Sequence, residues 1–196
     1  MVTHDEAAFA TAALADPSAA SAAGDPVPDV EPQRTEPDPY DVARQIVLRQ
    51  LAMVPRSRAE LLQKLGQRGC APAVAGAVLD RMTQVGLVDD EAYAHMLVRS
   101  QQAGRGLAKR ALARELRTKG IEGELAEKAL SSISDEDERD RARALVDKKL
   151  RAMHGLGIEV QTRRLAGMLA RKGYSSSMTF AVIREAIADA PEHLPD

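Results

Sequence analysis

The sequence predicts an all-α protein of three tandem three-helix bundles, about nine helices in all. Its 196 residues are 44% apolar, but only 3% are aromatic and none is Trp. The apolar residues are mainly Ala, Leu, Val and Met, and Ala and Leu favour helices, whereas strands favour aromatic and β-branched residues. In addition, one pattern recurs around Gly69, Gly120 and Gly173, at intervals of 51 and 53 residues. A period of this length indicates tandem copies of one helical unit.

The same neighbours surround each of these three glycines. Leucine stands four and eight residues before each Gly, and a cation comes immediately before it. Leucines four apart lie on one face of a helix, a cation suits the last turn, and Gly adopts the left-handed conformation that ends a helix. Apolar residues recur after each Gly, so each unit is expected to hold a helix, a glycine cap and a second helix. The leucines are Leu61 and Leu65, Leu112 and Leu116, and Leu165 and Leu169, and the cations are Arg68, Lys119 and Lys172.

A further helix is expected before each of these pairs. Ser57 and Glu60 have the spacing of a capping box, and Pro72 suits the first turn of the helix after Gly69. The stretch from Asp135 is expected to carry solvated i,i+4 ion pairs such as Asp135–Arg139. The three preceding helices are expected at residues 41–53, 90–102 and 135–153. The N-cap candidates are Asp89 or Asp90 for the second of them, and Ser134 or Asp135 for the third.

The expected domain organisation follows from this periodicity. It comprises a disordered acidic Pro/Ala-rich tail at 1–39, three-helix repeats at 40–88, 89–134 and 135–190, the middle one basic, and a C-terminal tail at 191–196. A bundle of about 50 residues is marginal alone, so the repeats are expected to stack into an elongated, curved body. The leader has seven more acidic than basic residues, whereas the rest of the chain has five more basic than acidic. We interpret the leader as solubilising, with screening of the basic body as the alternative.

Several classes of protein are excluded by composition. Cys70 is the only cysteine, so an internal disulfide is impossible and a reducing compartment is compatible. No apolar run approaches the ~20 residues that span a bilayer. The chain starts with acidic rather than basic residues, which argues against a secretory signal. A cytoplasmic protein without membrane contact is expected.

No constellation of residues predicts an enzyme. The four histidines are scattered, so a zinc site lacks a ligand set, and no Walker-type glycine loop is present. Gly104 and Gly106 follow no predicted strand, which disfavours a dinucleotide site. Cys70 is better interpreted as a packed residue than as a nucleophile, and Asp89 and Asp90 as capping groups than as an acid–base pair. We therefore expect no catalytic residue, no metal and no cofactor.

A basic surface is the main candidate for function. Seven cations and the single acid Glu115 lie between residues 99 and 119. On a helix, Arg110, Arg114 and Arg117 fall within about a 60° sector, opposite the apolar side chains. Such a face suits phosphates or a carboxylate-lined groove, although a merely soluble helix surface is the alternative. Because no aromatic residues are interleaved with the cations, any DNA contact is expected to be with the backbone and weakly sequence-specific.

Two other hypotheses remain from the residues alone. Residues 57–85 also fit a helix-turn-helix pair, which would make the chain a direct DNA-binding regulator. Its second helix, however, offers mostly Ala and Val where base-reading residues would be needed. A structural adaptor whose stacked helices recognise another helix is the third hypothesis.

One stretch of the sequence resembles a known family. Residues 86–94 (GLVDDEAYA), followed by Lys109-Arg110 and residues 115–121 (ELRTKGI), are similar to the central repeat of RecX proteins, of an actinobacterial type. The resemblance covers about residues 40–190, and it departs from the family at Leu97, often aromatic there, and at Gln101, often Arg. The motif positions to which it gives a structural role are Asp89, Asp90, Tyr93, Glu115, Leu116, Lys119 and Gly120.

The resemblance implies a non-enzymatic regulator. RecX-like proteins bind the groove of the RecA–DNA filament and inhibit its recombinase, ATPase and co-protease activities in DNA repair and the SOS response. It implies the RecA filament as the partner of a monomer without cofactor, with Lys119 mainly ending its helix. Which cations would touch RecA and which DNA stays open. The cations that would form the RecA- or DNA-binding surface are Arg99, Arg105, Lys109, Arg110, Arg114 and Arg117.

Overall fold

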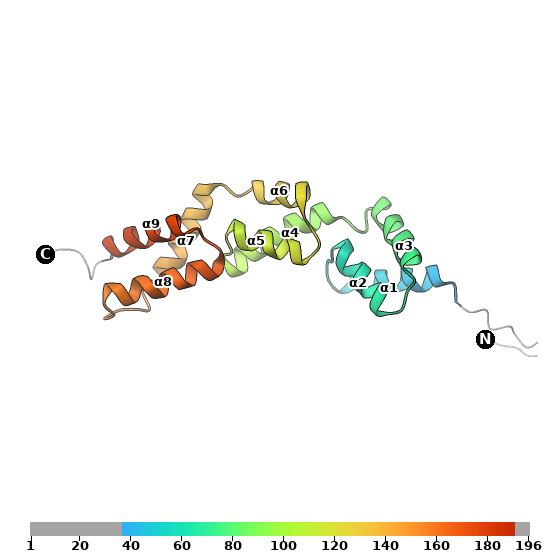
Figure 1. Ribbon diagram of the computed structural model, residues 1–196, viewed down its shortest axis with the longest axis horizontal. Helices are drawn as coiled ribbons and strands as arrows, with labels where there is room; N and C mark the ends of the chain where they lie inside the picture. Colours follow the sequence, from blue (N-terminus) through green and yellow to red (C-terminus); the bar gives the residue numbers. More distant parts are fainter. Residues whose placement is uncertain (1–36, 191–196) are drawn as a thin grey trace, which may run out of the picture. The chain divides into compact units, whose positions relative to one another are not determined.

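The computed structural model describes residues 37–190, and these form nine α-helices in three groups (Figure 1). The first group is α1 (Pro39–Met53), α2 (Arg58–Gln67) and α3 (Pro72–Gln84); the second is α4 (Asp90–Arg105), α5 (Lys109–Thr118) and α6 (Gly123–Ser131); the third is α7 (Asp135–Leu150), α8 (Ile158–Lys172) and α9 (Ser176–Ala188). Each helix packs mainly against the other two of its group. The predicted all-α fold of three three-helix units is confirmed. These groups are called repeats 1, 2 and 3 below.

The two predicted tails lie outside the described residues, apart from residues 37–39. Of these, Pro39 already begins α1, with the side chain of Asp38 accepting a hydrogen bond from the Tyr40 N–H at its start.

Several helix ends are set by the residues that the sequence singled out. The Ser57–Glu60 capping box is formed at the start of α2, and Pro72 occupies the first turn of α3. The Asp89 carboxylate caps α4 by accepting from the Ala92 N–H at 2.9 Å, and Ser134 caps α7 in a second capping box. Each cap satisfies N–H groups that have no partner within their own helix.

Two helices end elsewhere than predicted. Helix α4 continues to Arg105, because the left-handed residue that stops it is Gly106, with φ of 62°. Helix α7 ends at Leu150, three residues before the expected Met153. Met153 lies in the following turn, where its side chain is buried and its carbonyl accepts a hydrogen bond from the buried amide of Gln161.

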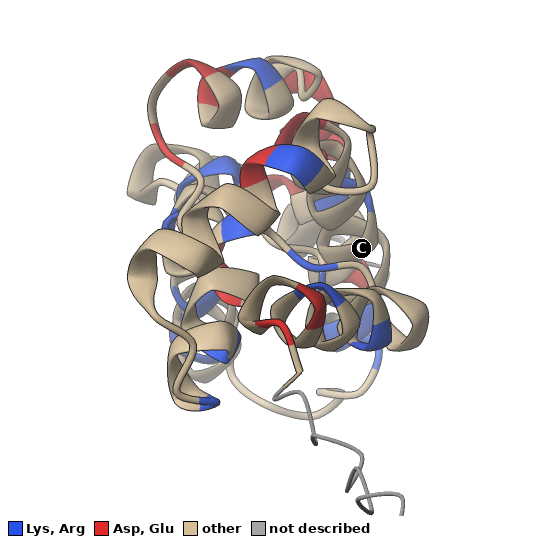
Figure 2. Cartoon of the chain, turned by 90° about the vertical axis from the view of Figure 1, so that its right-hand side faces the viewer, with Lys and Arg blue, Asp and Glu red and all other residues tan. Residues whose placement is uncertain are grey.

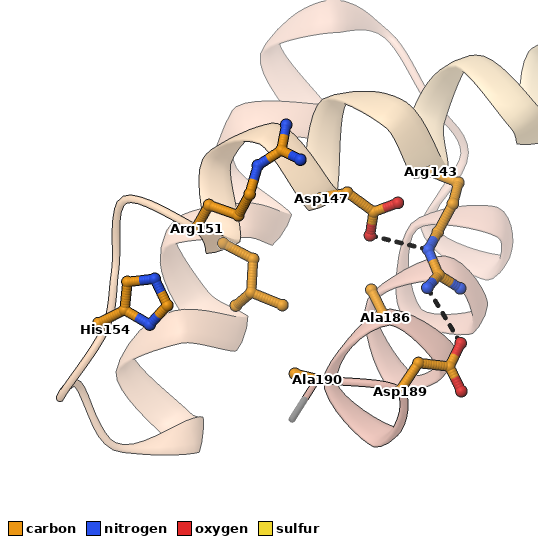
Figure 3. Close-up of a pocket in the computed structure, with 8 residues that line it drawn as sticks. Arg143, Asp147, Arg151, His154, Ala186, Asp189 and Ala190 are labelled. Carbon is orange, nitrogen blue, oxygen red and sulfur yellow. Dashed lines mark hydrogen bonds and ion pairs between the residues drawn. The ribbon is translucent and has the colours of Figure 1, made fainter. Parts of the chain in front are cut away.

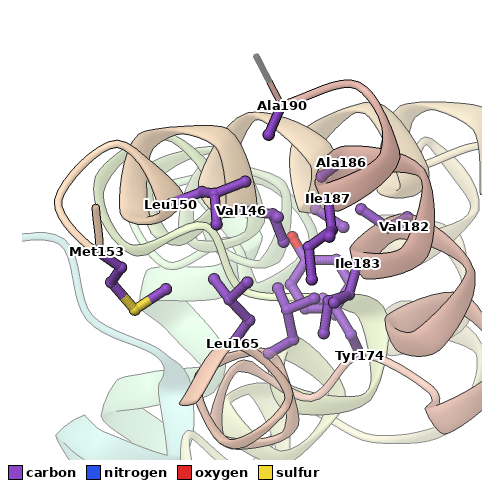
Figure 4. Packing of buried hydrophobic residues seen from close by; sticks show 13 residues of the cluster. Val146, Leu150, Met153, Leu165, Tyr174, Val182, Ile183, Ala186, Ile187 and Ala190 are labelled. Atoms are coloured by element: carbon purple, nitrogen blue, oxygen red, sulfur yellow. The ribbon is translucent and has the colours of Figure 1, made fainter. Parts of the chain in front are cut away.

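Each repeat has its own apolar core, to which the leucine pairs contribute. All six of these leucines are at most 1% exposed. In repeat 3, Val146, Leu165 and Ile183 meet from three different helices, and Figure 4 shows their side chains converging. Burial of this extent contributes about 1.5–3 kcal/mol per large apolar side chain.

Contacts between successive repeats join the ends of their second helices. The Ser57 hydroxyl, at the start of α2, donates to the carbonyl of Lys119 at the end of α5, at 2.6 Å. The Ala108 N–H, at the start of α5, donates to the carbonyl of Lys172 at the end of α8, at 2.9 Å. The negative end of one helix dipole therefore meets the positive end of the next at both joints, which is a favourable arrangement.

Gly120 and Gly173 are required at these joints for two reasons. Their φ angles of 73° and 91° belong to the left-handed region, as predicted. A Cβ on Gly120 would also overlap the Cβ of Ala59, and one on Gly173 would lie 2.7 Å from the backbone N of Ala111. Gly69 has a similar φ of 78° but meets nothing within 4 Å. The same residue thus ends three helices, but only two of these ends are packed against another repeat.

One predicted ion pair of α7 is wrong, although the helix does have another i,i+4 pair, Arg143–Asp147, at 2.9 Å. Asp135 does not pair with Arg139 along α7. Asp135 instead lies 3.2 Å from Lys109 of α5, and Arg139 pairs with Glu185 of α9. Asp135 and Arg139 pair with residues of other helices because those helices bring opposite charges close to them. The spacing of residues along one helix does not reveal such contacts.

Replacing Gly120 with Ala is expected to destabilise the protein more than replacing Gly69 with Ala. Both changes force a left-handed alanine, at about 1–2 kcal/mol, but only G120A also places a methyl group against Ala59. Urea unfolding followed by circular dichroism measures the difference. An equal decrease in the free energy of unfolding for G69A and G120A would show that the contact with Ala59 adds no cost at Gly120.

Candidate functional site

The motif residues gather where repeat 2 meets repeat 1, around the carboxylate of Glu60. The Lys119 ammonium donates to Glu60 Oε1 at 2.7 Å, and the Tyr93 hydroxyl donates to Oε2 at 3.1 Å. The backbone N–H of Ser57 completes the set at 3.2 Å. Lys119 therefore does more than end its helix, and Tyr93 is a buried side chain with a polar contact rather than core alone. Glu60 is the residue that sequence reasoning understood only as a capping group.

The ionisation of this cluster follows from its contacts. Burial alone would raise the pKa of Glu60, but hydrogen bonds from Lys119, from the Ser57 backbone and from Tyr93 outweigh burial and hold that pKa below the ordinary value. Burial, followed by the negative charge of Glu60, raises the pKa of Tyr93 to about 12. The ion pair and its tyrosine donor are thus both in place at neutral pH.

The remaining motif residues also have structural contacts. The Asp90 carboxylate accepts from the backbone N–H of Arg58, at 2.8 Å, so it caps a helix of the preceding repeat instead of its own. Leu116 is fully buried, and Glu115 pairs with Arg105 at 2.9 Å. Together with the packed Gly120, these residues build the second repeat and its joint with the first.

The joint between repeats 2 and 3 uses the same kinds of contact. The Tyr174 hydroxyl donates to the Gly106 carbonyl at 3.2 Å, and the Lys172 ammonium donates to the carbonyl of Arg105. Glu138 accepts from the backbone N–H of Lys109, at the start of α5. Each joint therefore has a lysine, a glycine, a tyrosine and an acid contributed by the later repeat.

The predicted basic surface has exposed side chains, but not all of them are free of partners. Arg110, Arg114 and Arg117 are exposed on α5, opposite its buried face, as the 3.6-residue period requires. Arg117 lies 3.4 Å from Glu122 in a pair that is more than 60% exposed on both sides, and Lys109 lies near Asp135. Exposed pairs of this kind contribute only about 0–1 kcal/mol and exchange readily for another anion.

Three of the six predicted cations form no ion pair within residues 37–190. They are Arg99 of α4 and Arg110 and Arg114 of α5, and all three are exposed. Basic and acidic positions are interspersed over the described helices (Figure 2), so pairing rather than local charge alone singles these side chains out. Two of the three lie on one helix face, whereas Arg99 belongs to another helix.

Two hollows show which cations come together. Arg105 and Arg114 line a hollow of about 180 Å³ with Arg171 of α8, a residue that the sequence did not single out. Lys109 and Arg110 line a larger hollow, of about 570 Å³, with residues of repeat 3. Arg99 borders neither of them. The sequence did not predict Arg171 as part of the basic surface, because it lies beside α5 only where repeat 3 packs against repeat 2. No local sequence pattern indicates that contact.

The described residues offer no sign of a metal centre. Within residues 37–190, no three side chains of the types His, Cys, Asp and Glu gather closely enough to hold an ion. Cys70 is half-buried against the core of repeat 1. In the same part of the chain, no helix is long and apolar enough to cross a bilayer.

Comparison with known proteins identifies the family. Residues 43–82 match the first three-helix domain of RecX, residues 89–130 the second and residues 135–183 the third. The chain belongs to the RecX family. The resemblance inferred from the central motif is therefore confirmed, and each matched stretch falls within one of the three helical groups.

RecX proteins of two genera illustrate the likeness. The chain is 48% identical to "Regulatory protein RecX" of Streptomyces coelicolor over 169 residues, which are 85% of this chain and 88% of that protein. It is 46% identical to the protein of the same name from Mycobacterium sp. (strain KMS) over 172 residues, 85% of this chain and 91% of the other. The actinobacterial character of the sequence is confirmed by these relatives.

Solved RecX structures share the fold. The crystal structure of RecX from Lactobacillus salivarius superposes with a TM-score of 0.69 at 21% identity, over 76% of this chain and 97% of the other. A second crystal structure, of regulatory protein RecX, gives a TM-score of 0.66 at 24% identity, over 76% and 72% of the two chains. At these identities the likeness concerns the fold alone.

Replacing Glu60 with Gln is expected to lower stability at pH 7 by about 1–3 kcal/mol, because charge-assisted hydrogen bonds to Lys119 and Tyr93 are weakened. Since the folded pKa of Glu60 is depressed, its contribution is present above the unfolded pKa and is lost as pH falls through the folded value. Urea unfolding of the wild type should therefore lose more stability between pH 7 and low pH than that of E60Q.

The matched control is Glu127→Gln, because the Glu127 side chain is exposed and has no hydrogen bond or ion pair with any residue of the described range 37–190. It should retain the wild-type pH dependence. If E60Q and E127Q follow the same pH profile, the Glu60 cluster does not stabilise the joint.

Proposed function

We propose that this RecX-family chain is a non-enzymatic regulator of the RecA recombinase, binding the RecA–DNA filament and inhibiting its recombinase, ATPase and co-protease activities. The relatives' name, "Regulatory protein RecX", agrees with a regulatory role. The observation that carries the proposal is the exposed face of α5, where Arg110 and Arg114 lie without ion-pair partners. The protein would act as a cytoplasmic monomer, in DNA repair and the SOS response.

The position of these cations argues against a merely soluble surface. Lys109 and Arg110 stand in the first turn of α5, which contains no acid, and its N-cap residue Ala108 makes no side-chain cap. Positive charge at a helix N-terminus is unfavourable by about 0.3–1 kcal/mol. Lys109 is accounted for by its ion pair with Asp135. Arg110 has no ion pair within residues 37–190, so a negatively charged partner explains its position better than helix stability does.

The partner chemistry follows from guanidinium groups. Arginine binds phosphate and carboxylate oxygens through two parallel N–H donors, and it keeps its charge at any physiological pH. The proposed binding residues are those expected from the sequence, with the addition of Arg171, which lies beside Arg114. A DNA–protein filament presents both phosphates and carboxylates. Which of the two each arginine contacts is left to the experiments below.

Regulation requires a difference between filament states. A ligand shifts an equilibrium only by its differential affinity for the two states. Three linked bundles suit this task, since once one repeat is bound the others act at high effective concentration. Several weak contacts can then together give stable binding to adjacent protomers of the RecA filament.

The helix-turn-helix hypothesis gains no support from the described residues. The exposed positions of α3 that precede Asp80 are Pro72, Ala73 and Ala77, which offer no side-chain donors or acceptors to base edges. Sequence-specific readout by this helix is therefore disfavoured.

The decisive variant replaces Arg110, Arg114 and Arg117 with Glu. It should lose inhibition of RecA's ATP hydrolysis on single-stranded DNA, by at least tenfold in the concentration that gives half-inhibition. Helicity should be unchanged, because all three side chains are exposed.

A control of equal net charge replaces Arg49, Arg68 and Arg184 with Glu. These arginines are also exposed and have no ion pairs within the described chain, but they lie on α1, at the end of α2 and on α9. The control should inhibit nearly as well as the wild type. Normal inhibition by the α5 variant, or equal loss in both variants, would refute the surface assignment.

A further inference from the structure

Repeat 1 has an open apolar groove between α1 and α3 that the proposed basic surface does not use. Its volume is about 480 Å³. Val78 and Met82 form part of its floor and belong to the core of the repeat. Three of the apolar side chains at its margin are well exposed, with 49% of Tyr40, 50% of Val85 and 51% of Leu87 accessible. The groove is therefore a place where the core of repeat 1 is incompletely covered.

The corresponding grooves of the other two repeats are bridged by ion pairs. In repeat 2, Lys128 of α6 lies 2.5 Å from Glu91 of α4. The positions 51 residues earlier, one repeat period, are Tyr40 and Ala77, and both line the open groove.

In repeat 3 a smaller hollow, of about 290 Å³, remains between α7 and the end of α9, but its rim is ion-paired. Arg143 of α7 lies 3.0 Å from Asp189, the C-cap residue of α9, and also contacts Asp147; Figure 3 shows this guanidinium between the two carboxylates. A second pair, Arg139–Glu185, joins the same two helices. Within residues 37–190, only repeat 1 has no ion pair between its first and third helices. The difference is local chemistry and not a different fold.

Exposed large apolar side chains are concentrated in repeat 1. Of the eleven within the described residues, eight belong to this repeat. An exposed apolar groove flanked by charged side chains is typical of a surface that binds another molecule.

The charge around the groove indicates what kind of partner. Arg44 and Arg81 line it, with Asp41 as the single acid among its lining residues. Neither arginine forms an ion pair within residues 37–190, and residues 40–88 as a whole contain seven basic and three acidic side chains. A partner segment with apolar anchors could pack against the apolar floor of the groove, and acidic residues beside these anchors could pair with Arg44 and Arg81.

We propose that this groove binds an amphipathic helix with acidic flanks, contributed by the protein component of the filament. Two packed helices form its walls, and Tyr40, Arg44 and Leu48 border it at four-residue intervals. The eight-residue rise from Tyr40 to Leu48 is about 12 Å, which is close to the length of two turns of a bound helix with anchors at i, i+4 and i+7. The inference rests on the proposed function in one respect, that RecA supplies the helix.

The groove and the basic surface then have separate tasks. Repeat 1 holds protein through apolar contacts, and the face of α5 holds anions. Because the two sites belong to different repeats, substitutions in one should leave the other intact, and this separation makes the proposal testable.

The test uses the full chain with Leu48→Asp and Leu87→Asp, singly. Leu48 and Leu87 are 38% and 51% exposed, and Leu62→Asp is the matched control, since Leu62 is 41% exposed in the same repeat but lies on α2, away from the groove. Binding is measured to RecA filaments on single-stranded DNA and, separately, to the naked DNA. We expect at least tenfold weaker filament binding for L48D and L87D, less than twofold change for L62D, and unchanged DNA binding for all three.

The rim is tested by charge reversal. Arg44→Glu should weaken filament binding severalfold, and the loss should diminish as salt is raised, because exposed charges are screened. Arg49→Glu, also exposed on α1 but not lining the groove, is the control and should have little effect. Equal effects of R44E and R49E would refute the acidic flanks.

A photoreactive benzoylphenylalanine at position 48 identifies the occupant. A cross-link to a RecA helix rich in Asp or Glu supports the proposal. A cross-link to a second copy of this chain, or within the same chain, overturns it, as does undiminished filament binding by L48D and L87D. If the wild type binds no RecA filament, the proposed function itself fails, and the groove proposal fails with it.

Discussion

The direct meeting of helix ends between successive repeats is the constraint on which the described chain depends. Helix α5 can end against the start of α2 only if the residue after its last turn takes a left-handed conformation without a side chain, and Gly120 does both. The same holds where α8 meets α5 at Gly173. At the first joint, the carboxylates of Glu60 and Asp90 accept from N–H groups at the start of α2, and Lys119 and Tyr93 donate to Glu60 in turn. At the second joint, Lys172 and Tyr174 donate to carbonyls at the end of α4. The apolar cores lie mainly within the repeats, with Ala108 of repeat 2 packing into the core of repeat 3, whereas hydrogen bonds and ion pairs are concentrated at the joints.

This division explains which features were predictable from the sequence. Capping residues and the 3.6-residue apolar period act over one or two turns, so the Ser57–Glu60 box and the buried faces of the second helices could be read from local spacing. The contact between Lys119 and Glu60 joins residues 59 apart, and the approach of Arg171 to Arg114 depends on how α8 meets α5. No spacing rule within a helix reaches that far. The sequence indicated that Lys119 and Lys172 end their helices. That each also donates a hydrogen bond to the preceding repeat is evident only from the structure.

The joints also sort the charged residues into two groups. Cations such as Lys119 and Lys172 are held by oxygen atoms of the preceding repeat and are committed to assembly of the chain. Arg110 and Arg114 have no such partners within residues 37–190 and lie on the face of α5 turned away from the core. A count of basic residues along the sequence cannot separate these groups, because both occur in the same stretch. Pairing and burial can, and they narrow a run of seven cations to the few that are available to another molecule.

The three repeats share a backbone but differ in what covers the seam between their first and third helices. In repeats 2 and 3, opposite charges reach across it, at Glu91–Lys128 and Arg143–Asp189. Exposed pairs add little stability, about 0–1 kcal/mol, so their main effect is to make the seam polar and unattractive to apolar partners. Repeat 1 has Tyr40 and Ala77 at the positions of the first pair and leaves apolar surface open. In a protein whose joints and cores are otherwise repeated, an apolar rim found at one seam is better explained by binding than by folding, because the other two copies show that the fold is compatible with an ion-paired, polar seam.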